Sequence, residues 1–209
     1  MRHKDFADAF LDAFEICQQQ ANVGSLYADA KNWTHFMLGA PPAQKPAGVL
    51  RLAATLWAST SQQEVPCSLH GQWYTLDLCA VAPPYDESGD YWSTRTVLTI
   101  EHENGYDVET EMWKLAHWRS DLSVLVFYDF NEEERASDAM CVSDKAMPNV
   151  KKADWLTSKL QGLSNIVRQV DEDRAARHLL IVGSRAQSND VQIRWRFYEW
   201  SESGFTLAL

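Results

Sequence analysis

Three acidic side chains, Asp77, Glu101 and Glu103, stand where carboxylates could carry out chemistry. Asp77 lies inside an alternating and largely apolar segment that begins at Gln72. An ionised group in such a strand is costly unless it is paired, hydrogen-bonded or bound to a metal. Glu101 and Glu103 are two residues apart in a second alternating segment, so their side chains share one face of a strand and repel each other.

Pairing of the two segments would bring the three carboxylates together. An antiparallel hairpin centred on Gly89 places Asp77 opposite Glu101 on the neighbouring strand. Like charges this close raise one another's pKa unless a cation neutralises them. Carboxylate oxygens in this number suit Mg²⁺ or Mn²⁺ better than zinc. The spacing therefore predicts a divalent-metal site made by Asp77, Glu101 and Glu103.

The elements that must position these residues follow from periodicity. Residues 131–153 are polar and are expected to be a loop, and the apolar Gly48–Ser59 suits a helix or a buried strand, with a helix favoured. The pattern predicts one α/β domain over residues 1–209, with a mixed sheet flanked by helices. The expected helices are Asp5–Ala21, Asp107–Ser120 and Asp154–Val170, and the expected strands are Gln72–Ala80, Arg95–Glu103, Leu122–Phe130, His178–Gly183, Gln192–Trp200 and Phe205–Leu209.

Composition limits the class of protein. The 209 residues, of which 45% are hydrophobic, suffice for one globular domain and exclude a disordered or fibrous chain. The chain shows neither the roughly 18 consecutive apolar residues of a membrane span nor the apolar core of a signal peptide, so we expect a soluble cytoplasmic protein. The four cysteines are isolated, which indicates neither a zinc site nor a disulfide framework. Walker, G-x-G-x-x-G and G-x-S-x-G motifs are absent from the sequence.

The order of a strand carboxylate, a Glu-x-Glu pair in the next strand, a helix and an apolar strand resembles the core of the PD-(D/E)XK nuclease superfamily. This superfamily includes many restriction endonucleases and DNA-repair nucleases. The matching segment runs from Trp73 to Phe130. The resemblance implies a restriction-endonuclease-like core over about residues 5–130, with the helix Asp5–Ala21 leading it and residues 154–209 adding a helix and strands.

The resemblance also implies roles for individual residues. Asp77 and Glu101 match the acidic residues that hold the metal in catalytic members of the family. Glu103 stands where the family usually has lysine, and Lys114, two turns into the following helix, is the candidate for a migrated lysine. The implied reaction is hydrolysis of DNA with Mg²⁺ or Mn²⁺, in which Glu103 or Lys114 orients the attacking water and the products are a 5′-phosphate and a 3′-hydroxyl.

Alternatives remain open for each residue. Asp77 could be a structural aspartate, and Glu101 and Glu103 could lie on a solvated face of the sheet. Glu109, Glu111 and Lys114 could form the wet face of a helix, on which Glu111 and Lys114 support each other three residues apart. His102 is expected to point away from the carboxylates. A non-catalytic binding or assembly module that keeps the same fold is therefore the second hypothesis for function.

Charge is distributed unevenly along the chain. The formal net charge is −10, whereas a protein that binds nucleic acid through its phosphates is usually basic. Residues 85–111 contain eight acidic residues and one basic residue, whereas residues 151–196 contain nine basic and five acidic residues. Arg194 and Arg196 share a strand face that suits either phosphate contacts or partners for carboxylates. The only support for a homodimer is that symmetric dimers are common among proteins in general.

Overall fold

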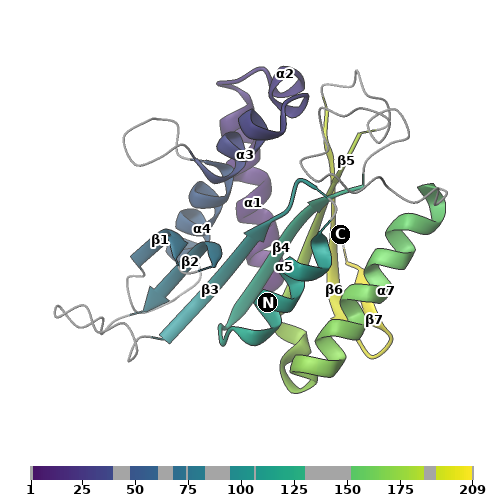
Figure 1. Ribbon diagram of the computed structural model, residues 1–209. Coiled ribbons are helices and arrows are strands. Elements are labelled where there is room, and N and C mark those ends of the chain that lie inside the picture. The colour runs from purple at the N-terminus through teal and green to yellow at the C-terminus, as the bar shows by residue number, and fades with distance from the viewer. Residues whose placement is uncertain are drawn as a thin grey trace.

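A mixed sheet of seven strands forms the centre of the computed structural model (Figure 1). The structure describes residues 2–39, 48–60, 68–73, 75–82, 95–105, 107–129, 152–185 and 192–208. The strands are β1 (Ser68–Trp73), β2 (Leu76–Ala82), β3 (Arg95–His102), β4 (Leu122–Tyr128), β5 (His178–Ser184), β6 (Arg194–Ser201) and β7 (Gly204–Leu207). They lie in the sheet in the order in which they occur in the chain.

The type of strand pairing changes twice across the sheet. Strands β1, β2 and β3 form an antiparallel meander, β3, β4 and β5 are parallel, and β5, β6 and β7 are antiparallel. Each of the two parallel connections contains a helix, as a crossover between parallel strands requires. This arrangement is the mixed α/β sheet that the sequence predicts.

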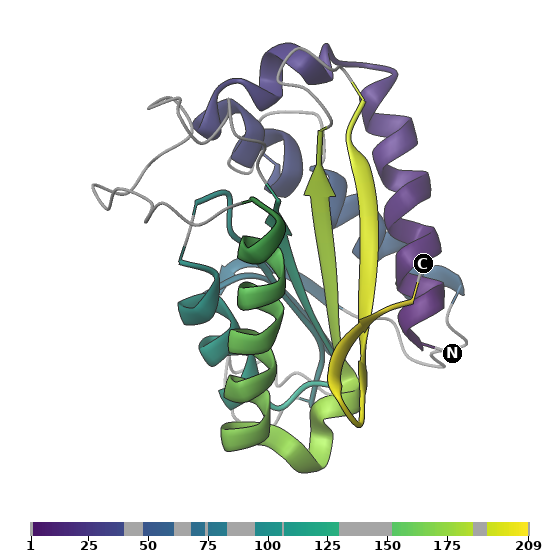
Figure 2. The same cartoon turned by 90° about the vertical axis from the view of Figure 1, so that its right-hand side faces the viewer.

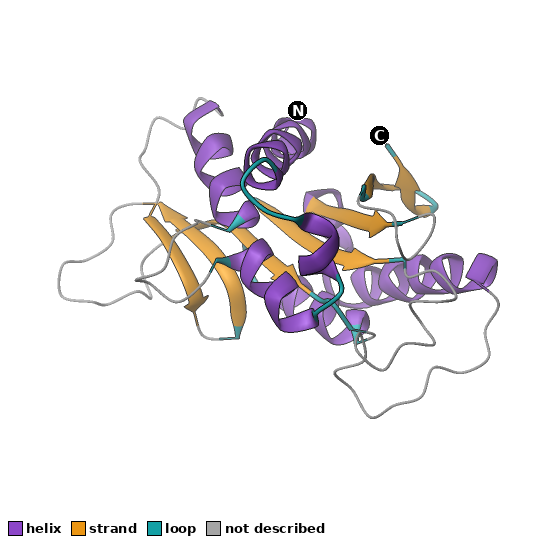
Figure 3. Ribbon diagram, turned by 90° about the horizontal axis from the view of Figure 1, so that it is seen from above, coloured by secondary structure: helices purple, strands orange, loops and turns teal. Residues whose placement is uncertain are grey.

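Helices cover both faces of the sheet, so the domain has three layers (Figures 2 and 3). One apolar core lies between the sheet and the four N-terminal helices, and a second lies between the sheet and α5 with α7. No helix among the described residues has both the length and the apolar character to cross a membrane. The helices are α1 (Arg2–Gln18), α2 (Val23–Tyr27), α3 (Ala30–Leu38), α4 (Val49–Thr60), α5 (Val108–His117), α7 (Lys152–Asp171) and the 3₁₀ helix η3 (Glu172–Arg177).

Burial follows the apolar patterns of the sequence. On α1, the predicted stripe that includes Phe6, Phe10 and Phe14 is buried in the first core. Every residue of β4 is buried, as a nearly continuous apolar run predicts for a strand covered on both faces. The helix favoured over residues 48–59 is confirmed as α4, and the predicted loop 131–153 lies almost entirely outside the described residues.

The single strand predicted over Gln72–Ala80 is wrong. Trp73 pairs with Leu76, so the chain reverses between them and the segment belongs to two strands, β1 and β2. The alternation of side chains continues through this tight turn, and no glycine, proline, asparagine or aspartate marks it. The two short helices α2 and α3 also escaped prediction, since five and nine residues give little periodicity to detect.

Arg177 ties the second helical layer to the sheet. Its guanidinium donates to main-chain carbonyls at the end of α5, among them those of Leu115 at 3.3 Å and Ser120 at 3.1 Å. It also forms an ion pair with the buried Asp171 at 2.8 Å. A helix end has carbonyls without partners inside the helix, and Arg177 supplies the donors. The Arg177 side chain is therefore fixed between α5, α7 and the start of β5.

We predict that Arg177→Met destabilises the protein by about 3–5 kcal/mol, because it leaves the Asp171 carboxylate buried with less compensation. Arg174 pairs with the same carboxylate at 2.7 Å, but its side chain is 43% exposed. Arg174→Met is the matched control and should cost no more than about 1 kcal/mol. Urea denaturation of both variants measures the two costs, and equal losses would contradict the role given to Arg177.

Candidate active site

The pairing of β2 with β3 puts Asp77 beside Glu101. Leu78 pairs with Ile100 and Cys79 with Thr99, which confirms the predicted register. The backbone N–H of Asp77 donates to Glu101 Oε2 at 3.3 Å. The backbone N–H of His102 in turn donates to Asp77 Oδ2 at 2.9 Å. Each carboxylate is therefore held by the main chain of the opposite strand.

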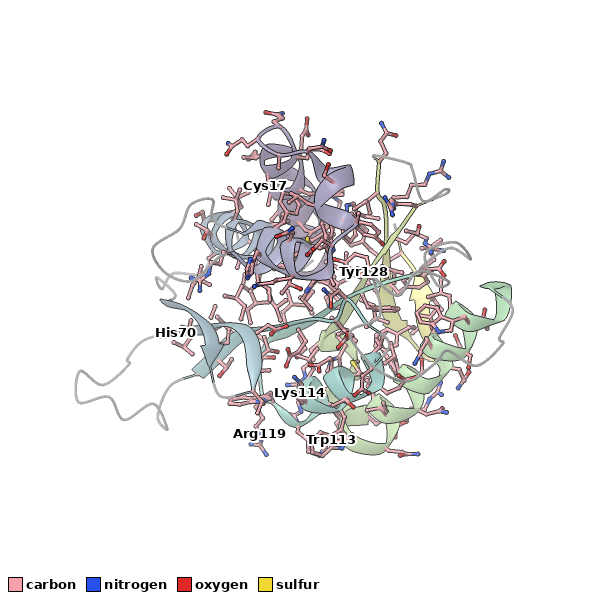
Figure 4. The ribbon with its side chains drawn as sticks, turned by 45° about the horizontal axis from the view of Figure 1, so that its top comes forward. Cys17, His70, Trp113, Lys114, Arg119 and Tyr128 are labelled. Atoms are coloured by element: carbon pink, nitrogen blue, oxygen red, sulfur yellow. The ribbon has the colours of Figure 1, made fainter. Side chains whose placement is uncertain are left out.

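Lys114 reaches this pair from α5. Its Nζ lies 2.9 Å from Glu101 Oε1, and it donates to the Thr75 carbonyl at 3.1 Å. The Glu101 side chain is fully buried and that of Lys114 is 21% exposed. Figure 4 shows Lys114 beside the sheet, on the side where α5 lies. Three of the four residues singled out from sequence, Asp77, Glu101 and Lys114, thus come together from three different elements.

Glu111 also belongs to the site, although its place in the sequence predicted no functional role for it. It forms an ion pair with Lys114 three residues later, so the pairing expected from their spacing is confirmed. The solvated helix face proposed for both residues is wrong, because their side chains are only 16% and 21% exposed. The available signal was the acidic residue one turn before the candidate lysine.

Burial and like charge dominate the electrostatics of Glu101. Burial is the larger influence and, with the neighbouring Asp77 carboxylate, raises the Glu101 pKa to about 9, although Lys114 opposes the shift. For Lys114, burial alone would lower the pKa, but its bonds to Glu111 and Glu101 outweigh burial and raise it. The ionised form of Glu101 is therefore disfavoured here, and a further cation beside Asp77 and Glu101 would oppose that shift.

Glu103 follows the last residue of β3 and is held differently. Its carboxylate accepts a hydrogen bond from the N–H of Gly105, and its own N–H donates to the Val126 carbonyl at 2.9 Å. Burial is the main cause that raises the Glu103 pKa. Within the part of the chain that the structure describes, no group of three or more Asp, Glu, His or Cys residues is arranged to hold a metal. Of the three carboxylates predicted to form one cluster, the structure therefore joins Asp77 and Glu101, whereas Glu103 is held by Gly105.

His102 lies on the opposite face of β3, as predicted. Its Nε2 is 2.8 Å from the hydroxyl oxygen of Tyr128, and the two rings meet edge to face. Tyr128 itself packs among Tyr27 and Trp33 in the first core. Burial lowers the His102 pKa to about 3, so the imidazole is neutral at pH 7. Figure 4 shows Tyr128 and Lys114 on opposite sides of the strands.

The sequence left open whether Arg194 and Arg196 of β6 are partners for carboxylates or are available for phosphate contacts. Arg196 lies 2.8 Å from Asp129 Oδ2 at the end of β4, so it is a partner for a carboxylate. Arg194 is exposed. The strand face therefore presents one arginine that is engaged within the protein and one that reaches solvent.

Comparisons of this chain with protein-family models, with curated proteins and with solved structures give no match.

We predict that His102 makes the protein less stable in acid. Unfolded histidine binds a proton below about pH 6.5, whereas folded His102 binds one only near a pKa of about 3. Between these values the unfolded state holds one more proton at this residue, so the contribution of His102 to stability falls as pH falls, by up to about 1.4 kcal/mol per pH unit.

Urea denaturation at pH 7, 6, 5 and 4 measures this slope. His102→Gln should reduce it by about one proton. His35→Gln, which changes an exposed histidine on α3, is the control and should leave the slope as in the wild type. An unchanged slope in His102→Gln would show that His102 does not cause the acid sensitivity.

Proposed function

We propose that this protein is a divalent-metal-dependent nuclease of the PD-(D/E)XK type that hydrolyses phosphodiester bonds in DNA. The observation that carries the proposal is the meeting of Asp77 from β2, Glu101 from β3 and Lys114 from α5. The order of elements supports it: a leading helix, a meander with carboxylates on its second and third strands, a helix, and a buried strand parallel to the third. On this proposal the segment from α1 to β4 is a restriction-endonuclease-like core.

The donor set fits a hard divalent cation. Mg²⁺ is usually held by one or two carboxylates, with water and substrate phosphate completing its coordination. Asp77 and Glu101 are two such carboxylates, and burial together with the neighbouring Asp77 raises the Glu101 pKa. We assign them as the ligands, with Glu103 as the third carboxylate of the predicted cluster if its side chain exchanges the Gly105 N–H for the ion. A bound Mg²⁺ or Mn²⁺ supplies Lewis-acid activation of a water and of the phosphate.

The protein's own groups would then position the reactants. Lys114 brings a positive charge and three N–H donors within 3 Å of Glu101. Release of its contact with Glu111 would let Lys114 donate to the attacking water or to a phosphate oxygen and so orient the attack. The resemblance offers Glu103 as the alternative residue for that task. Bound cations would also offset part of the local acidity of residues 85–111.

A non-catalytic binding or assembly module is the second candidate function. The observation that favours it is that Lys114 is already engaged by Glu101, by Glu111 and by the Thr75 carbonyl. Charges paired in this way can serve a purely structural purpose and hold α5 against the sheet. Metal-dependent cleavage separates the two candidates, because a module predicts none.

We predict that the wild-type protein nicks or linearises plasmid DNA with Mg²⁺ or Mn²⁺ and not in EDTA. Asp77→Asn, Glu101→Gln and Lys114→Met should each lower the rate about 10²–10⁴-fold, the range for the loss of a positioned acid–base or metal-binding group. Gel electrophoresis of the plasmid over time measures the rates.

Glu109→Gln is the matched control for these variants. Glu109 lies on the same helix, but its carboxylate pairs with Lys159 of α7 at 2.6 Å and faces away from the site. It should keep nearly full activity. Cleavage that persists in EDTA, or that survives in Asp77→Asn and Glu101→Gln, would overturn the proposal, and absence of cleavage by the wild type on supercoiled, linear and single-stranded DNA would favour the binding module.

A further inference from the structure

Trp113, the residue before Lys114, exposes an aromatic surface next to the candidate active site. It is 53% exposed, and among the described residues the other exposed large apolar side chains are aliphatic: Leu11, Ile16 and Leu207. An indole gains much by burial, so one left half in water is informative when it stands beside a site. Lys114, the next residue on the same helix, reaches Glu101 of the sheet, whereas Trp113 is exposed to solvent.

The indole is part of a fixed pair of rings. The centroid of the His117 ring lies 4.1 Å from that of Trp113, one helical turn earlier, at an angle of 45°. The His117 ring is held by a contact of 2.8 Å between its Nδ1 and the Trp113 carbonyl oxygen. Two rings held together before any ligand arrives lose little conformational freedom when a flat ligand stacks on them.

The surroundings of this ring pair favour a ligand that is both flat and anionic. Lys114 and Arg119 lie on the same helix and just beyond its end, and Figure 4 shows both on the side of the molecule where Trp113 lies. The two acidic residues of this helix, Glu109 and Glu111, are paired with Lys159 and Lys114. A nucleotide combines a flat base with an anionic phosphate, so it matches both features.

We propose that Trp113 and His117 form a platform on which a base of an unpaired nucleic acid strand stacks, with the adjoining phosphate directed toward Lys114. The inference rests on the proposed function in taking nucleic acid as the ligand, and it adds that the strand is single or locally opened. A base in an intact duplex has both faces covered by its neighbours and cannot use the platform. The stack would position the strand and would not take part in bond cleavage.

Binding in EDTA tests the platform separately from cleavage. The probes are fluorescein-labelled dT₂₀, a 20-mer of the same charge made of abasic sites, and a 20-base-pair duplex, and the readout is fluorescence anisotropy at low salt. Trp113→Ala should weaken binding of dT₂₀ about 5–150-fold, the range for loss of one base–aromatic stack. Trp113→Phe should restore most of it, and Leu207→Ala, which removes an exposed apolar side chain on β7, should change nothing.

The abasic strand and the duplex show whether loss of base stacking causes the weaker binding of Trp113→Ala. Trp113→Ala should leave the affinity for both within about twofold of the wild type, since neither offers a free base. Equal losses on all three probes, unchanged dT₂₀ binding in Trp113→Ala, or no binding of dT₂₀ by the wild type would overturn the platform. Loss of plasmid cleavage with dT₂₀ binding and its Trp113 dependence intact would reject the nuclease proposal and leave the platform standing.

Discussion

The burial of Glu101 beside Asp77, with Lys114 as the nearby cation, is the interaction around which this side of the protein is arranged. A fully buried carboxylate next to another one is unfavourable in isolation, which is why the Glu101 pKa rises to about 9. Three elements must be in place to tolerate it. Strand β2 supplies a backbone donor, β3 supplies Glu101 itself, and α5 supplies Lys114.

The rest of the fold keeps those elements in position. Two apolar cores clamp the sheet, so β2 and β3 cannot change their register without exposing one face. On the far face of β3, the neutral His102 and Tyr128 fill the first core directly behind Glu101. At the C-terminal end of α5, Arg177 binds the last carbonyls of the helix and fixes the helix that carries Lys114, Glu111 and Trp113. Stability and the candidate chemistry thus depend on the same contacts.

The sequence predicted those parts of this arrangement that depend on the alternation of side chains between the two faces of a strand. The alternation around Asp77 and Glu101 determines which face each residue takes, and one hairpin then brings them together, as the structure confirms. It could not predict where Lys114 points, because that depends on how α5 is rotated against the sheet. It also missed the turn between Trp73 and Leu76, where alternation continues through the reversal, and Glu111, whose partner becomes clear only once Lys114 is placed.

Calorimetric titration of the apo protein with Mn²⁺ tests the central claim most directly, because it needs no substrate. If Asp77 and Glu101 are the ligands, the wild type binds Mn²⁺ and unfolds at a higher temperature with saturating metal, as ligand linkage requires. The Asp77→Asn/Glu101→Gln double variant, folded by circular dichroism, should show neither effect, and Glu109→Gln should show both. No binding to the wild type, or equal binding to the double variant, would contradict the account.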